Sequence, residues 1–333
     1  MCEVMSTKLK KLMKLGVSLL LAITLIYMAF KGINWADFWE NLKCTRWGFI
    51  VLFLLCVLAT IWIRALRWKV MLKPLDANIS TRTTWHANNI GNLTNAILSG
   101  SGELVRCAFA CRGGANYDAV LGTEIMERAW DALAIILLAF IAILSGSDAI
   151  GEFFTQHIVA PVTSSSTTLI WAGCGIAALV LIICLCFRFR RTNKVCGAVA
   201  NFLGGVGQGF ISFRKIHNKG AFLAFTVLLW VMYIFMYHFI LQAVPALSGL
   251  NVYDALLLAA VGNLASVIPV PGGVGAYHYL IALCLSAIYG IDWNIGILFA
   301  TLQHELHAVL LIVLGIMSCV KTNLKFQSYD VLA

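Results

Sequence analysis

The sequence is poor in charged residues, which make up only 12% of its 333 residues, whereas hydrophobic residues make up 61%. A typical soluble domain has about 25% charged residues. A chain with half of that fraction lacks the polar residues needed to cover a water-exposed surface. Apolar runs long enough to cross a bilayer, which takes about 20 residues as a helix, occur several times. The composition excludes a soluble enzyme and predicts an all-α polytopic membrane protein.

Basic residues are absent between Lys219 and Lys321, although the chain has a net charge of +9. They gather instead beside the ends of apolar runs, as in Lys8–Lys14 and Arg188–Lys194. Such clusters orient membrane spans and contact anionic lipid headgroups. A nucleic-acid surface would place this charge on a soluble domain, so we expect no nucleic-acid partner.

Motifs of catalysis and of metal binding are also missing. The 11 cysteines include no C-x-x-C pair, and thiols in apolar runs behave as small hydrophobes. Ser99–Gly102 lacks the strand that a nucleophile elbow needs. His304, Glu305 and His307 form H-E-x-H, which differs from the zinc motif H-E-x-x-H. We therefore predict no catalytic residue, no metal and no cofactor.

Six apolar segments are predicted to span the membrane as helices. They are 15–31, 48–66, 119–144, 167–187, 220–244 and 295–319. Placing both termini in the cytoplasm puts nearly every Lys and Arg on that side. No small-residue cleavage site follows 15–31, so we interpret it as a retained span rather than a signal peptide. Residues 1–333 are predicted to form a single integral membrane domain, with 194–217 as an interfacial helix.

Two further apolar stretches, 84–105 and 254–290, are interrupted by residues that break helices. The first is rich in Asn and Gly, and the second contains a Pro-Gly cluster between 269 and 275. Non-helical backbone is tolerated at membrane depth only where protein or a wet cavity satisfies its polar groups. We therefore predict two re-entrant helical hairpins, each made of two short helices joined by a break.

The two stretches share a short sequence pattern at a constant offset of 171 residues. The identical positions are Gly91, Asn92 and Leu93 with Gly262, Asn263 and Leu264, then Ile97 with Ile268 and Gly102 with Gly273. Three full spans separate the copies, so the second enters the membrane from the opposite side. This arrangement predicts an inverted repeat with halves 15–145 and 167–319, whose broken helices meet near the midplane. The N-termini of such half-helices favour an anionic ligand.

Charged residues and glycines beside the breaks are the candidate site residues. Charges within a span normally face the protein interior or a cavity, and arginine holds phosphate bidentately. The predicted substrate-binding residues are Asn92, Gly102, Glu103, Arg106, Arg128, Pro271, Gly272, Gly273 and Gly275. For charge balance or proton coupling we predict Glu127, Asp131, His278 and Glu305. Arg64 and Arg67, with Trp62 and Trp68, are interpreted as an interfacial belt with snorkelling arginines.

In order and spacing these residues resemble the lysylphosphatidylglycerol synthase/flippase-type membrane domain family, over about 15–320. The matching places are Arg64 with Arg67-Trp68, Asn92 with Gly102-Glu103-Leu104-Val105-Arg106, Glu127-Arg128 with Asp131, and Pro269 with Pro271-Gly272-Gly273-Val274-Gly275. The resemblance implies a bacterial or archaeal cytoplasmic membrane and lipid translocation. Some relatives fuse this domain to a soluble aminoacyltransferase, which the sequence to Ala333 does not contain. Members commonly carry an acidic residue where this chain has His278, and Glu305 is the carboxylate that could replace it.

Three functions fit these observations. The favoured one is a lipid transporter that binds an anionic phospholipid headgroup between the two hairpins. The second is a membrane-embedded enzyme that modifies a lipid with Glu103, Glu127 or Asp131 as its acid or base. The third is a non-catalytic partner of a separate lipid synthase. The small residues Gly204-Gly205-x-Gly207 are compatible with a homo-oligomer.

Overall fold

Every regular element in the described part of the chain is a helix. The computed structural model describes residues 23–75, 79–98, 100–145, 218–265 and 270–322, together with single positions elsewhere. The helices over these ranges confirm the all-α class. The predicted span 167–187, the interfacial helix 194–217 and the first part of the span 15–31 lie outside the described residues, apart from single positions.

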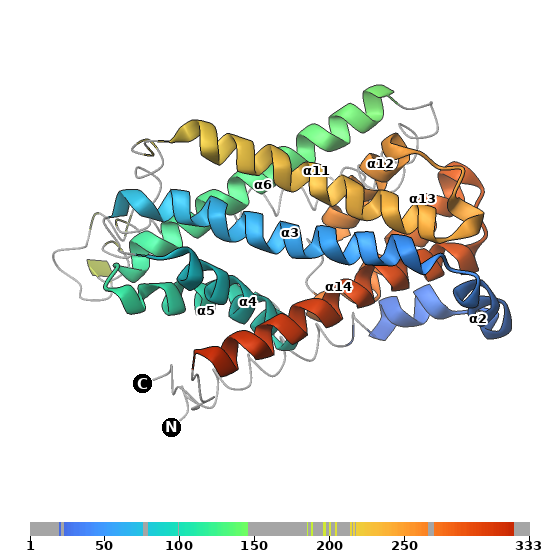
Figure 1. Ribbon diagram of the computed structural model, residues 1–333, viewed down its shortest axis with the longest axis horizontal. Coiled ribbons are helices and arrows are strands. Elements are labelled where there is room, and N and C mark those ends of the chain that lie inside the picture. The colour runs from blue at the N-terminus through green and yellow to red at the C-terminus, as the bar shows by residue number, and fades with distance from the viewer. Residues whose placement is uncertain are drawn as a thin grey trace.

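Four long helices form the body of the molecule (Figure 1). They are α3 (Trp47–Leu72), α6 (Tyr117–Ser145), α11 (Lys219–Ala243) and α14 (Trp293–Lys321). Each one contains or nearly coincides with a predicted span. Among the described residues, α3, α11 and α14 are long and apolar enough to cross a membrane, with mean hydropathies of 2.6, 2.0 and 1.8. At 1.5 Å per residue, α3 is about 39 Å long.

The helix α2 (Trp35–Lys43) lies in a segment for which the sequence analysis predicted no element. It begins after Asn34, whose side chain accepts hydrogen bonds from the backbone N–H groups of Ala36 and Asp37. This N-cap satisfies backbone donors that a helix start leaves unpaired. Phe38 is the buried residue of the helix, so α2 rests on the core by one side and exposes the rest.

Both interrupted stretches fold as pairs of short helices joined by a break. The first pair is α4 (Thr81–Ile97) and α5 (Gly102–Ala110), and the second is α12 (Val252–Ala265) and α13 (Ala276–Tyr289). Gly100 breaks the first pair with φ +79°. Gly272, Gly273 and Gly275 break the second with φ of +63°, +74° and +85°. These are left-handed values that residues with a Cβ rarely adopt, which explains the glycines at these places.

The two hairpins lie toward opposite ends of the long helices (Figure 1). The break of the second hairpin, Pro271–Gly273, nevertheless reaches α4 of the first. Equivalent glycines also make equivalent contacts. A Cβ on Gly91 would lie 3.0 Å from Cβ of Arg106, and a Cβ on Gly262 would lie 2.8 Å from the ring of Tyr277. Both glycines therefore let the second arm of their own hairpin approach the first, and both contacts obey the offset of 171 residues.

Candidate functional site

A network of ion pairs joins α3 to α6 inside the helix bundle. Arg67 on α3 donates from Nη2 to Oε1 of Glu127 at 2.7 Å and from Nη1 to Oδ1 of Asp131 at 2.8 Å. A third bond runs from Nη2 to Oδ2 of Asp131 at 3.1 Å, so the Asp131 carboxylate is held by both terminal nitrogens. Glu127 and Asp131 lie four residues apart and so share one face of α6. The side chains of Arg67 and Glu127 are fully buried.

Arg106 extends this network from the first hairpin. Its Nη1 lies 2.7 Å from Oε2 of Glu124, and its Nη2 donates to Oε2 of Glu127 at 2.7 Å. The guanidinium also lies over the ring of Trp68, 3.9 Å from the ring centroid, where the ring quadrupole attracts a cation. Trp68 is fixed in turn by a hydrogen bond from its Nε1 to Oγ1 of Thr123 at 3.1 Å. The hairpin is thus tied to both long helices through one buried cation.

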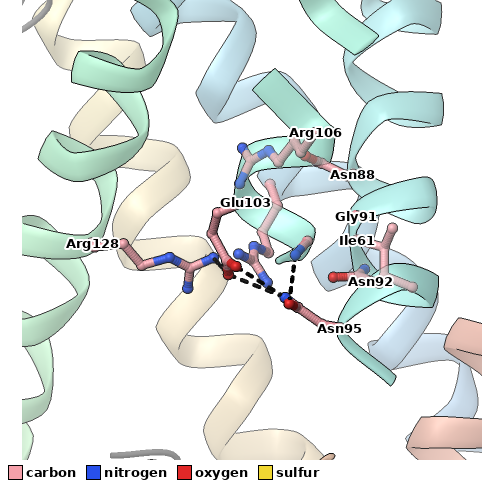
Figure 2. Close-up of a pocket in the computed structure, with 10 residues that line it drawn as sticks. Ile61, Asn88, Gly91, Asn92, Asn95, Glu103, Arg106 and Arg128 are labelled. Atoms are coloured by element: carbon pink, nitrogen blue, oxygen red, sulfur yellow. Dashed lines mark hydrogen bonds and ion pairs between the residues drawn. The ribbon is translucent and has the colours of Figure 1, made fainter. Parts of the chain in front are cut away.

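The outer edge of the network is formed by Arg128 and Glu103. Arg128 donates from Nη2 to Oε1 of Glu103 at 3.1 Å and from Nε to Oε1 of Glu124 at 3.2 Å. Its side chain is 46% exposed. Asn95 links this edge to the break, since its amide donates to both oxygens of Glu103 and its Oδ1 accepts from the backbone N–H of Gly102. Figure 2 shows Arg128, Glu103 and Asn95 converging from α6, α5 and α4.

A narrow pocket opens beside this network. It encloses about 290 Å³ of empty space, near the lower limit of about 300–1,000 Å³ for ligand sites. Its lining residues are Ile61, Arg64, Asn88, Gly91, Asn92, Asn95, Gly102, Glu103, Arg106 and Arg128 (Figure 2). The structure therefore gathers five of the predicted binding residues around one pocket, and all five come from the first hairpin and α6.

The predicted binding residues of the second hairpin do not line this pocket. A Cβ on Gly275 would lie 2.7 Å from the backbone nitrogen of Ile26, so this glycine allows the N-terminal helical segment to approach the break. The carbonyl of Gly272 lies 2.9 Å from Nε2 of His304. His278 and Glu305 are also near this break, with Nε2 and Oε1 3.7 Å apart. The second hairpin thus has a polar cluster of its own.

The interpretation of Arg67 and Trp68 as interfacial residues is wrong. Both are fully buried, and Arg67 is held by two carboxylates rather than extended toward headgroups. Trp62, by contrast, is 47% exposed. A positive charge near the end of an apolar run suggests snorkelling, and the sequence contains no indication that carboxylates about 60 residues later lie opposite it.

Two pocket residues were missed by the sequence analysis, Arg64 and Asn88. Arg64 lies one turn before Arg67 and forms no ion pair with any described residue. Asn88 is only 4% exposed, and neither its Nδ2 nor its Oδ1 has a hydrogen-bond partner among the described residues. The Asn-rich run in α4 was a usable indication for Asn88. Buried polar groups without partners are rare in folded proteins, and here they face a pocket.

This architecture defines a class, an α-helical membrane protein with two broken hairpins and an internal network of arginines and carboxylates. The model of the family described as lysylphosphatidylglycerol synthase TM region matches residues 14–315. The chain belongs to this family, which connects it to the membrane and to lipid-related function. Comparisons with curated proteins and with solved structures found no match.

Proposed function

We propose that the protein is a lipid transporter of the flippase type that binds an anionic phospholipid headgroup in the pocket beside α4, α5 and α6. The observation that carries this proposal is the unused hydrogen-bonding capacity of the pocket. Arg64 has no ion-pair partner among the described residues, and the buried amide of Asn88 makes no hydrogen bond there. A phosphate group would accept from both, since arginine binds phosphate bidentately.

The charge of the network supports a phosphate with one negative charge. Four arginines (Arg64, Arg67, Arg106 and Arg128) stand against four carboxylates (Glu103, Glu124, Glu127 and Asp131). Arg67 and Arg106 use their terminal nitrogens on carboxylates. Arg64 is therefore the cation best placed to hold the phosphate, and half-exposed Arg128 is suited to first contact. Binding leaves the network one negative charge in excess, which fits proton coupling through its carboxylates, and Glu127 and Asp131 stay the predicted residues.

The arrangement of the hairpins supports transport rather than simple binding. Their positions at opposite ends of the long helices (Figure 1) and the paired contacts Gly91–Arg106 and Gly262–Tyr277 are what an inverted repeat would produce. In inverted-repeat transporters, broken helices from the two halves expose one site alternately to the two sides. We infer that the two breaks are re-entrant and that the lipid tails remain in the bilayer while the headgroup passes between the halves.

The orientation follows from the basic residues outside the network. At the end of the long helices where α3 and α14 finish, these residues are Lys69, Lys73, Arg82, Arg112, Lys219 and Lys321. The other end carries Lys31, Lys43 and Arg46. By the positive-inside rule, we propose that the first end faces the cytoplasm of a bacterial or archaeal cell and that both chain termini lie on that side.

Reconstitution in liposomes tests the proposal. Phosphatidylglycerol and phosphatidylcholine with fluorescent headgroups would be compared for the rate at which inner-leaflet label becomes accessible to an external quencher. We expect faster exchange of phosphatidylglycerol with the wild-type protein and at least a tenfold loss of rate in Arg64→Ala. Arg46→Ala is the matched control, because Arg46 is an exposed arginine at the start of the same helix.

The outcomes separate the three candidate functions. Exchange that Arg64→Ala abolishes and Arg46→Ala preserves supports the transporter and the pocket together. Exchange that is unaffected by Arg64→Ala argues against this pocket as the headgroup site. Folded protein without exchange of either lipid contradicts the transporter and favours the membrane-embedded enzyme or the partner of a separate synthase.

A further inference from the structure

A cluster of two histidines and one glutamate lies beside the break of the second hairpin. His278 is in the first turn of α13, and His304 and Glu305 are near the middle of α14. Nδ1 of His304 lies 3.0 Å from Oε1 of Glu305, and Nε2 of His278 lies 3.7 Å from the same oxygen. One ligand atom from each of the three side chains lies within 4.8 Å of the other two.

The hydrogen bonding of His304 determines which of its nitrogens is available. The carbonyl of Gly272 can only accept, so Nε2 of His304, 2.9 Å away, carries the hydrogen. In a neutral imidazole the other nitrogen, Nδ1, then has a lone pair directed at the Glu305 carboxylate. Two acceptors at 3.0 Å repel each other unless a proton or a cation lies between them. A histidine that donates to a backbone carbonyl with one nitrogen and presents the other is the usual state of a metal ligand.

The surroundings of the cluster favour a metal ion over a proton. His278 is 1% exposed, its Nε2 points to the same carboxylate, and its ring centroid is 5.3 Å from that of His304. One additional proton would satisfy only one of the two imidazole–carboxylate contacts, whereas a single divalent cation would satisfy both. Glu305 is also 47% exposed on a helix that crosses the membrane, where an uncompensated carboxylate is costly.

The distances also suit a tetrahedral ion. Bonds of about 2.0–2.2 Å, as zinc forms with histidine and carboxylate, place neighbouring ligand atoms of a tetrahedron about 3.3–3.5 Å apart. The two contacts with Glu305, 3.0 and 3.7 Å, lie on either side of that value. Small side-chain rotations would therefore bring the ligands to coordination distance without a change in the helices.

We propose that His278 Nε2, His304 Nδ1 and Glu305 form a binding site for a divalent transition metal, with Zn²⁺ as the best match. Two imidazoles and one carboxylate are a ligand set that zinc uses with a fourth position open for water or another oxygen ligand. The ion would tie α13 to α14 and, through the Gly272 carbonyl, hold the backbone of the break. This site is separate from the pocket of the first hairpin and does not depend on the proposed transport function.

Sequence spacing could not indicate this site. The histidine pair in H-E-x-H, His304 and His307, does not have the spacing of a zinc motif, which led us to predict no metal. In the structure the second histidine ligand is His278, which comes from another helix 26 residues earlier. His307 is not part of the cluster.

The test measures the zinc content of the full chain, purified without a polyhistidine tag. After incubation with micromolar Zn²⁺ and gel filtration, we expect about one zinc per chain by mass spectrometry of the metal. Glu305→Gln keeps the size of the side chain and removes the anionic ligand, so the zinc dissociation constant should rise at least tenfold. His278→Ala and His304→Ala should lose the ion, while His307→Ala, the matched control from the same motif, should retain it. Circular dichroism and gel filtration establish that each variant is folded.

A second measurement identifies the ligands directly. Co²⁺ in a tetrahedral site with nitrogen and oxygen ligands gives visible absorption bands, which should appear in the wild type and in His307→Ala. Folded wild-type protein that takes up neither zinc nor cobalt overturns the proposal. Uptake that is the same in Glu305→Gln and in the wild type also overturns it, because the ion then binds elsewhere. Loss of lipid exchange has no bearing on either result, so this proposal and the transport proposal fail independently.

Discussion

Neutralising Glu127 is expected to destabilise the protein by about 3–5 kcal/mol, the usual effect of removing one partner from a buried ion pair. Glu127→Gln keeps the shape of the side chain but leaves one acceptor oxygen. Because Oε1 receives Arg67 and Oε2 receives Arg106, each at 2.7 Å, one guanidinium must face an NH₂ group whichever way the amide turns. Water cannot replace the lost acceptor, since the Glu127 side chain is fully buried. At about 1.4 kcal/mol per tenfold, the folding equilibrium should fall by roughly two to four powers of ten.

The assay is unfolding of the purified protein in detergent micelles by increasing mole fractions of SDS, followed by circular dichroism. Arg128→Gln serves as the comparison, because it removes contacts of 3.1 and 3.2 Å from a side chain that is 46% exposed. Exposed pairs contribute about 0–1 kcal/mol, so this variant should unfold close to the wild type. Arg46→Gln, on the exposed start of α3, should change stability by less than about 0.5 kcal/mol. The reasoning is refuted if Arg128→Gln destabilises as much as Glu127→Gln, because burial would then not determine the strength of these pairs.

Two further predictions use the same unfolding assay. Gly102→Ala should destabilise by about 1–3 kcal/mol, because its Cβ would collide with the Gly91 carbonyl and the Asn95 side chain. Gly100→Ala has open space and should show only the cost of a positive φ, about 1–2 kcal/mol; a larger effect at Gly100 than at Gly102 would contradict the close approach of α4 and α5. Trp68→Phe should lose about 1 kcal/mol with the hydrogen bond to Thr123, while the same change at exposed Trp62 should have little effect. Equal effects at the two tryptophans would contradict the burial assigned to Trp68.

The helices were predictable because their causes are local. Four of the predicted spans appear as α3, α6, α11 and α14, since about 20 apolar residues in a bilayer leave the backbone little alternative to a helix. The two breaks were predictable for a related reason, since glycine and proline in an apolar run interrupt helical hydrogen bonding. The helix α2 was missed because nine residues with a polar N-cap do not stand out in a search for long apolar runs.

The candidate site was predictable only in part. The charges of α6 were expected to face inward, and Glu127 and Asp131 do lie within the network. Their partners could not be assigned, because Arg67 is 60 residues before Glu127 and Arg106 belongs to a different helix. The same limit applies to the histidine–glutamate cluster, whose ligands are combined from α13 and α14.

The sequence by itself determined that this is an α-helical membrane protein of the lysylphosphatidylglycerol synthase TM family with two glycine-broken hairpins. These properties depend on composition and on short patterns along the chain, which the bilayer translates directly into helices and breaks. Only the tertiary structure decided that Arg67 is buried in ion pairs and that Arg64 lacks such a partner among the described residues beside a pocket. The physical reason is that a charge in low dielectric is stabilised by whatever lies within a few ångströms of it, and that neighbour is set by helix packing rather than by distance along the chain.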